Sequence, residues 1–422
     1  MARTWLVFIP IASLLTIACM GSAMAQSQPA DRLELVDRAA IASEIYSSIK
    51  MHFAHWRSLP TFDLEKEYRA YLQHALSVDD RRSFDLATIA FVAKLRNGHS
   101  GFDDQWLWDN HGQQLPFYAY PVDGHWAITK SETPGLLPGD VIATIDGEDF
   151  ERFFERNAKY ISASDERWSR RSFFEYTYLF PDRFVLGLMD GRNVSIVRKG
   201  KHEWAGAEYT HAERKVQPDF IYIRIPSFDK DVFEQEAMDS IQKVGPSTSL
   251  ILDVRGNHGG STPEKLVAAL MDRPYRWWAE STPQSISLFD YREYWGKHVE
   301  AYWYGDITQP IATAYKGRVF LLIDGGCFSA CEDFVAPFKD NHRAVLIGER
   351  TAGSSGQPFS QSLGNGMGIG LGTKREFFPD GSEFEGVGIV PDIEVKLTTE
   401  DLRQGKDRVF SRAEELTRHP RP

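Results

Sequence analysis

The residues best suited to do chemistry surround Ser329, in the segment Gly325-Gly326-Cys327-Phe328-Ser329-Ala330-Cys331-Glu332. An apolar run at 319–324 precedes this segment, and an amphipathic stretch that ends near Lys339 follows it. The pattern predicts a strand, a turn of small residues and a helix, with the serine hydroxyl at the helix N-terminus. Backbone N–H groups and the helix dipole favour negative charge there, which suits an attacking oxygen and an oxyanion beside it. The alternative is a serine that only caps the helix.

A second candidate segment is Asp253-Val254-Arg255-Gly256-Asn257-His258-Gly259-Gly260-Ser261, where a glycine-rich loop follows an apolar strand. The N–H group of Gly259 or Gly260 can donate a hydrogen bond to a developing oxyanion, because glycine lets the backbone approach closely. The alternatives are a tight turn between a strand and a helix, or a phosphate-binding loop. The glycine spacing matches neither of the common phosphate-binding fingerprints.

A serine nucleophile needs a base at neutral pH, and the base works best when a third group fixes its orientation. The glycine-flanked turn Arg96-Asn97-Gly98-His99-Ser100-Gly101 offers His99 as the base, with Ser100 beside it. Glu385, near the C-terminus, offers the orienting carboxylate. His258 is the competing base, and a purely structural role for the histidine is the third possibility.

Three regions of the chain must position these residues. From 33 to 95 apolar residues recur with a period near 3.6, which predicts N-terminal helices. Residues 111–204 show short alternating segments with turn residues, typical of a small β-rich module. After residue 217 strands and helices alternate, which predicts an α/β core with a mostly parallel sheet covered by helices. The boundaries we expect are 26–110 for the helical region that carries the His99 turn, 111–205 for the β-rich module, 206–400 for the α/β core and 401–422 for a C-terminal tail.

Residues 1–25 have the features of a secretory signal peptide. A positively charged start precedes an apolar run at 5–20, and the small residues at 23–25 offer a cleavage site. A membrane anchor is the rival interpretation, but the apolar run is short and contains Pro10. A lipoprotein signal at Cys19 is another alternative, although the leucine expected three positions upstream is absent. We therefore expect a periplasmic or secreted protein with no integral membrane segment after cleavage.

The composition narrows the class of protein. The net charge of −11 argues against nucleic acid or an anionic membrane as the partner. The 12 histidines are scattered without the helical pairing of a zinc site, so we expect neither a metal nor another cofactor. Without residues 1–25 the remaining cysteines are Cys327 and Cys331, on either side of Ser329. We favour two buried thiols, because cysteines four apart on a regular helix are poorly placed for a disulfide, which requires Cys327 to lie in the turn.

The segment 275–304 is rich in aromatic residues. Such clusters usually form core or a hydrophobic wall, and the alternative is that they line a substrate or ligand pocket. Its aromatic residues are Trp277, Trp278, Tyr291, Tyr294, Trp295, Tyr302, Trp303 and Tyr304.

Taken together, these segments resemble the C-terminal processing (tail-specific) peptidases and the tricorn-core proteases. The resemblance covers roughly residues 35 to 397 in matching order, which makes it specific although each motif is loose. It implies a ClpP/crotonase-like α/β core, a PDZ-like β-rich insert that helps to present peptide ends, and serine peptidase activity. The segments that carry it are the Gly-His-Ser turn at 98–100, Gly-Leu-Leu-Pro-Gly-Asp-Val-Ile at 135–142, the strand and loop at 252–260, Ser-Ala-Cys-Glu at 329–332, Gly-Glu-Arg-Thr at 348–351 and Glu-Gly-Val-Gly-Ile-Val-Pro-Asp at 385–392.

The resemblance implies a role for each matching residue. Ser329 corresponds to the nucleophile and the N–H group of Ala330 to one oxyanion donor. Gly259 or Gly260 corresponds to the other donor. The tail-specific branch has a catalytic lysine at the position of Ser354, so its serine–lysine dyad is absent from this chain.

The tricorn-like branch uses a histidine and a glutamate instead, and His99 and Glu385 fall at their positions. That branch places a helper serine directly before the histidine, where this chain has Gly98. Ser100, directly after the histidine, is the substitute that the sequence offers. The resemblance thus implies the histidine-type branch, in which His99 is the base and Glu385 and Ser100 orient it.

We therefore expect an exported serine peptidase that cleaves polypeptides through an acyl-enzyme. The alternative is a non-catalytic protein that binds an apolar ligand or peptide, because the fold also resembles the repeats of interphotoreceptor retinoid-binding protein. A third possibility is an esterase or amidase for small substrates, since acyl transfer uses the same groups. The deciding expectation is a distance: Ser329 Oγ should lie within hydrogen-bond reach of a ring nitrogen of His99.

Overall fold

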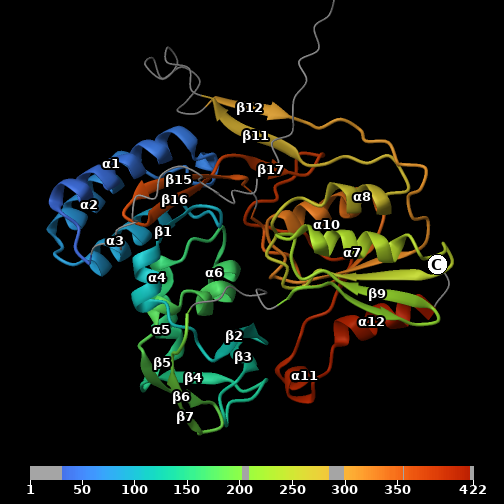
Figure 1. Cartoon of the computed structure of the whole chain (residues 1–422), viewed down its shortest axis with the longest axis horizontal. Coiled ribbons are helices and arrows are strands. Elements are labelled where there is room, and N and C mark those ends of the chain that lie inside the picture. The colour runs from blue at the N-terminus through green and yellow to red at the C-terminus, as the bar shows by residue number, and fades with distance from the viewer. Residues whose placement is uncertain (1–30, 202–208, 285–298, 355, 419–422) are drawn as a thin grey trace, which may run out of the picture.

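The computed structural model describes residues 31–201, 209–284, 299–354 and 356–418 (Figure 1). The signal peptide that we expect at 1–25 lies outside the described residues, as do Tyr291, Tyr294 and Trp295 of the aromatic segment. Figure 1 shows N-terminal helices beside a small sheet, a β-rich unit next to them, and a larger sheet with helices on both faces. Within the described ranges, no helix combines the length and the apolar character needed to cross a bilayer.

The N-terminal helices are confirmed, and they pack on a small antiparallel sheet. Helices α2 and α3 begin where the side chains of Asp63 and Asp80 accept hydrogen bonds from backbone N–H groups three residues on. A buried ion pair between Arg81 and Asp104 joins the start of α3 to the end of β1, so the His99 turn between them is held at both sides. The elements are α1 (Leu35–His52), α2 (Leu64–Ser77), α3 (Arg81–Ala93), and the strands β1 (Gly101–Asp104), β16 (Met367–Gly372) and β15 (Pro358–Gly364), in that sheet order.

A β-rich unit follows, as the alternating pattern predicts. A hairpin, a four-stranded antiparallel sheet and short helices enclose a core of phenylalanines around Trp126. These elements are α4 (Gln105–His111), β2 (Phe117–Val122), β3 (His125–Ser131), β4 (Ile142–Ile145), β5 (Glu148–Asp149), α5 (Phe150–Asn157), α6 (Glu166–Ser172), β6 (Arg183–Leu188) and β7 (Asn193–Val197).

The large sheet has the order β18-β14-β13-β10-β9-β8, and its neighbouring strands are parallel except for the β8–β9 pair. The expected mostly parallel sheet is therefore confirmed, with an antiparallel strand at one edge. Successive side chains of a strand point to opposite faces. Accordingly Leu250 and Leu252 pack under α7, α8 and α10, whereas Ile251 packs on the opposite face with α12. The strands are β8 (Glu213–Val216), β9 (Phe220–Arg224), β10 (Ser249–Asp253), β13 (Val319–Ile323), β14 (Val345–Gly348) and β18 (Ile393–Glu394).

Helices cover both faces of this sheet (Figure 1). The segment that we expect to be a C-terminal tail contains two helices, and the second buries Val409 and Ala413 against the sheet. The helices are α7 (Asp231–Ile241), α8 (Glu264–Leu270), α10 (Ala330–Asp340), α11 (Thr399–Gln404) and α12 (Arg408–Arg418).

The aromatic segment forms part of a third, antiparallel sheet of order β12-β11-β17. Trp278 is buried in the core, which is the usual place of aromatic residues. Trp303 and Tyr304 are exposed. The strands are β11 (Ala279–Gln284), β12 (Val299–Trp303) and β17 (Arg375–Phe377).

Candidate active site

Ser329 lies where strand β13 passes through a short turn into helix α10, as the sequence predicts. Its backbone has φ of 56°, a conformation that residues other than glycine rarely adopt. The side chain makes no capping hydrogen bond to the helix. Its Oγ instead lies 2.9 Å from Nε2 of His99, so the plain N-cap interpretation is wrong and the expected distance is confirmed.

The imidazole of His99 is fixed at both nitrogens and on one ring face. Its Nδ1 lies 3.2 Å from Oγ of Ser354. The ring of Phe328 stacks on the imidazole at a centroid distance of 4.6 Å and is itself stacked on Trp168 at 4.5 Å. When Nδ1 donates to Ser354, Nε2 is left as an acceptor for the proton of Ser329.

Glu385 is connected to His99 through the hydroxyl of Ser354. Its Oε1 accepts hydrogen bonds from Ser354 Oγ at 3.3 Å and Asn97 Nδ2 at 2.9 Å. Ser164 Oγ also donates to Oε1, at 2.5 Å. The carboxylate can therefore stabilise positive charge on the imidazole through a chain of hydroxyl groups.

Ser164 is a site residue that the sequence analysis missed. It comes from the loop before α6 in the β-rich unit, and its Oγ lies 3.0 Å from Ser354 Oγ and accepts from Gly98 N at 3.1 Å. No local pattern marks this serine, because it reaches the site only through the packing of the β-rich unit. Ser354 carried a signal, since it stands where the tail-specific branch has its lysine.

Ser100 is placed differently from our expectation. Its side chain is buried, donates to Asn97 Oδ1 at 2.9 Å and accepts from Gly372 N at 3.1 Å. It therefore ties the histidine turn to strand β16. The hydroxyl that contacts Nδ1 of the histidine belongs to Ser354.

Of the expected oxyanion donors, Gly259 packs directly against Ser329 and Ala330, and Gly260 follows it in the chain. A Cβ atom on Gly259 would lie 2.7 Å from the carbonyl oxygen of Phe328 and 2.8 Å from Cβ of Ser329, so only glycine fits there. However, Gly259 N already donates to Asn257 Oδ1 at 2.8 Å. In the described part of the chain, the N–H groups of Gly260 and Ala330 donate to no protein acceptor. Gly260 and Ala330 are therefore the better pair of donors.

The buried carboxyl group of Glu332 holds the loop that carries Ser354. It accepts hydrogen bonds from Thr351 Oγ1 at 2.5 Å, Gly353 N at 2.7 Å and Ser354 N at 3.0 Å. Burial raises the pKa of Glu332 to about 8, although these hydrogen bonds act in the opposite direction. The first turn of α10 thus fixes both Ser329 and the loop that places Ser354 beside His99.

Asp324 joins the two loops around the nucleophile. Its Oδ1 accepts from Gly256 N at 2.8 Å and Gly326 N at 3.0 Å, and its Oδ2 accepts from Arg171 at 2.6 Å. Burial acts to raise the pKa of Asp324, but Arg171 and the two backbone N–H groups hold it below its usual value. Since Arg171 comes from α6, this carboxylate also anchors the β-rich unit beside the site.

His258, the competing base, does not contact Ser329 in the described ranges. Its Nε2 lies 3.9 Å from Glu175, and its ring meets the edge of Trp168. The structure therefore brings His99, not His258, to the hydroxyl.

Cys327 and Cys331 form a disulfide, so the favoured interpretation of two free thiols is wrong. Cys327 lies in the turn before α10, and its Cα is 5.4 Å from that of Cys331, within the range that a disulfide requires. The bond spans the nucleophile and closes the turn around it.

Comparisons with known proteins relate part of this chain to one family of peptidases. Residues 219–395 match the sequence model of peptidase family S41. A carboxy-terminal-processing protease of Bartonella bacilliformis is 26% identical over 208 residues, which are 47% of this chain and 44% of that protein. The chloroplastic carboxyl-terminal-processing peptidase 2 of Arabidopsis thaliana is 26% identical over 261 residues, 61% of this chain and 46% of that protein. The matches thus span less than half the length of these curated relatives.

A solved structure of mature CPAF shares the fold. It superposes with a TM-score of 0.68 over 91% of this chain and 97% of that chain, at 16% sequence identity. The matched segment 219–395 contains Ser329, Ser354 and Glu385, whereas His99 and Ser164 precede it. Residues 219–395 thus resemble peptidase family S41, and the chain shares the mixed α/β fold of mature CPAF.

Proposed function

We propose that this protein hydrolyses peptide bonds through an acyl-enzyme, with Ser329 as the nucleophile and His99 as the general base. The observation that carries the proposal is the 2.9 Å contact between Ser329 Oγ and His99 Nε2. This distance lies within the range in which a base can accept the proton of its nucleophile.

In the first step, Ser329 Oγ attacks the substrate carbonyl carbon and its proton moves to Nε2 of His99. The imidazolium that forms is stabilised through its Nδ1–H, which donates to Ser354 Oγ, and Ser354 donates to the carboxylate of Glu385. The N–H groups of Gly260 and Ala330 hold the oxyanion. His99 then gives the proton to the leaving amine. In the second step, water attacks the acyl-enzyme, its proton moves to His99, and His99 returns the proton to Ser329 Oγ as the acyl group leaves.

Ser354 takes part in this mechanism as an orienting residue. Its hydroxyl accepts from the histidine and donates to the carboxylate, which a lysine at this position could not do, because an ammonium has no acceptor. The absence of the tail-specific lysine is therefore consistent with a histidine base.

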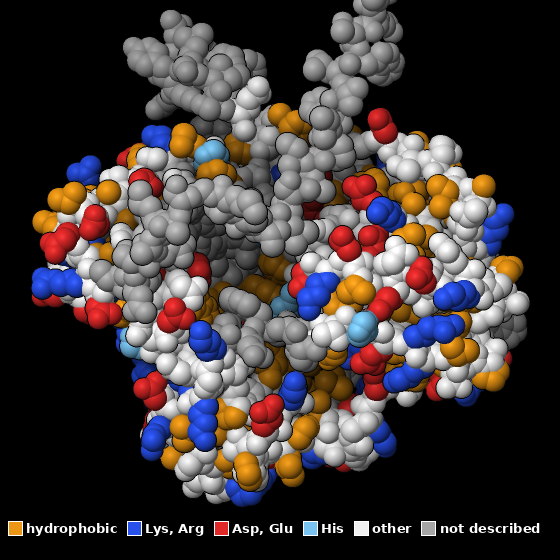
Figure 2. All heavy atoms as spheres, viewed as in Figure 1, with side chains coloured by type: hydrophobic (Ala, Val, Ile, Leu, Met, Phe, Trp, Pro, Cys, Tyr) orange, Lys and Arg blue, Asp and Glu red, His pale blue; other side chains and the backbone are white. Residues whose placement is uncertain are grey.

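Several finer features belong to the same proposal. We expect the β-rich unit to be PDZ-like and to present peptide ends, and the core to be ClpP/crotonase-like. The signal peptide predicted at 1–25 favours export to the periplasm or secretion, and a polypeptide is the expected substrate. Figure 2 shows a hollow near the centre of one face, with hydrophobic side chains inside it.

The test is labelling with a fluorophosphonate, which reacts with activated serines, together with hydrolysis of an unstructured polypeptide. We expect the native protein to be labelled and active, and Ser329→Ala and His99→Ala to lose both properties. Ser195→Ala, a change at an exposed position on β7, is the matched control and should behave as the native protein. Hydrolysis that persists in Ser329→Ala would refute the proposal, and an unlabelled native protein would favour the apolar-ligand or peptide-binding alternative.

A further inference from the structure

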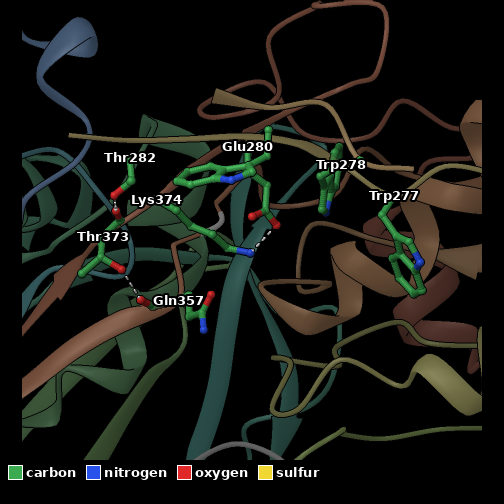
Figure 3. A pocket seen from close by; sticks show the side chains of 9 residues that line it. Trp277, Trp278, Glu280, Thr282, Gln357, Thr373 and Lys374 are labelled. Atoms are coloured by element: carbon green, nitrogen blue, oxygen red, sulfur yellow. Dashed lines mark hydrogen bonds and ion pairs between the residues drawn. The ribbon is translucent and has the colours of Figure 1, made fainter. Parts of the chain in front are cut away.

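A cavity of about 590 Å³ is lined by residues of the third sheet and of the segments beside it (Figure 3). Three tryptophans form much of its wall, and a glutamate–lysine pair lies at its centre. Its lining consists of Trp277, Trp278, Glu280, Thr282, Trp303, Gly305, Gln357, Thr373 and Lys374.

The walls of the cavity are connected to the segments that carry Ser329 and His99 by short series of contacts. On one side, Trp278 Nε1 donates to Asp333 Oδ1 at 3.0 Å. Asp333 is one helical turn beyond Ser329, and its backbone N–H donates to the carbonyl oxygen of Ser329 at 3.1 Å. On the other side, Thr373 N donates to Gly356 O at 2.9 Å. Gly356 packs directly against His99, since a Cβ on this glycine would lie 2.9 Å from Cβ of the histidine. These contacts fix the cavity walls relative to helix α10 and the histidine turn.

Glu280 and Lys374 are the charged residues that line this cavity, and two further carboxylates lie behind its wall. Lys374 Nζ lies 2.7 Å from Glu280 and 2.6 Å from Glu376, and Asp333 is the third carboxylate nearby. Burial raises the pKa of Glu376 well above its usual value, and the negative charge of Asp333 acts in the same direction. Even when Glu376 is left out of the count, the carboxylates of Glu280 and Asp333 exceed the single ammonium of Lys374. Glu280 retains a side-chain exposure of 37%, so a ligand can approach it.

The tryptophans favour the same kind of ligand. Glu280 pairs across the strands with Trp303, which is 53% exposed and places an indole beside the carboxylate. In the described part of the chain, no lysine or arginine stacks on Trp277, Trp278 or Trp303. An indole face next to a carboxylate attracts ammonium and guanidinium groups.

We propose that this cavity is a subsite that binds a lysine or arginine side chain of the polypeptide substrate, between the indoles and Glu280. The inference rests on the proposed peptidase function, and it names the substrate feature that the site selects. An acidic side chain is a poor occupant, because Lys374 is already held by two carboxylates and points toward Glu280 (Figure 3).

Peptide affinity, measured on Ser329→Ala so that no cleavage is needed, tests the subsite directly. Products of an unstructured polypeptide, identified by mass spectrometry after digestion with the native protein, show where basic residues lie relative to the cleaved bond. Matched peptides then carry lysine, norleucine or glutamate at that position. If the native protein yields no cleavage products, each position of one test peptide is replaced in turn by these three residues. We expect the lysine peptide to bind about tenfold more tightly than the norleucine peptide, in keeping with a cation held by indoles and a carboxylate.

Glu280→Gln, introduced into the Ser329→Ala variant, should reduce the preference for the lysine peptide to less than threefold without changing the affinity of the norleucine peptide. Glu213→Gln, at an exposed carboxylate on the edge strand β8, is the matched control and should retain the preference. Equal affinity for the lysine and norleucine peptides, or a preference that survives Glu280→Gln, would overturn the inference. Failure of fluorophosphonate labelling in the native protein would instead count against the proposed function, so the two failures are distinguishable.

Discussion

Replacement of Ser354 by alanine should slow acylation of Ser329 about 10- to 150-fold. The change removes the acceptor that lies 3.2 Å from Nδ1 of His99 and leaves the backbone N–H of residue 354 bonded to Glu332. Glu385 keeps its hydrogen bonds from Ser164 and Asn97, so the carboxylate does not become unpaired. The variant should therefore fold as the native protein does.

The magnitude follows from the charge that develops on the imidazole. A hydrogen bond to a charged group contributes about 1.5 to 3 kcal/mol. The contact between His99 and Ser354 has this character only after the proton has moved to the imidazole, so the loss falls mainly on the transition state. At about 1.4 kcal/mol for each factor of ten, the expected decrease in rate is about 10- to 150-fold.

The assay is the second-order rate of fluorophosphonate labelling, followed by kcat and KM for an unstructured peptide. A loss in kcat with little change in KM is expected, because the hydroxyl orients the base and does not bind the substrate. Ser195→Ala serves again as the exposed control, and thermal unfolding checks that both variants are folded. A labelling rate within twofold of the native rate would show that Ser354 does not orient His99.

Two further changes test the surroundings of the nucleophile. Gly259→Ala should lower the labelling rate at least tenfold, because its Cβ would lie 2.7 Å from Phe328 O. Gly256→Ala is the control, since it is also at positive φ but has no atom within 4 Å of its Cβ, and it should leave the labelling rate nearly unchanged. Equal effects of the two substitutions would contradict the close-packing argument. Because burial raises the pKa of Glu332 to about 8, the folded protein binds more protons than the unfolded chain between roughly pH 5 and 8, and its stability should fall as the pH rises through that range. Glu332→Gln should flatten that part of the curve of Tm against pH, and an unchanged slope would assign the titration to another group.

The secondary structure around the site was predictable because each signal is local. The apolar run at 319–323, the small residues of the turn and the amphipathic stretch after them lie within one short segment, and the structure has β13 and α10 there. The same holds for the histidine turn, which begins where the helical period ends. The position of Cys327 was the point left open by this pattern, and the disulfide shows that it belongs to the turn.

The pairing of Ser329 with His99 was predictable only through the order of motifs along the chain. The two residues are 230 positions apart, and no periodicity connects them. The resemblance to known peptidases supplied that connection, and it also singled out Glu385. It did not supply the correct hydroxyl, because Ser100 is adjacent to the histidine in sequence but bonds Asn97 and Gly372 in the fold.

The sequence by itself determined which strand, turn and helix present the serine, and which glycine-rich loop and histidine turn accompany it, because propensity and periodicity act over a few residues. The tertiary structure alone decided that Ser354 and Ser164 lie between His99 and Glu385, and that the N–H group of Gly259 donates to Asn257 Oδ1. Those relations depend on how separate segments pack, and long-range packing leaves no periodic trace in the segments that it brings together.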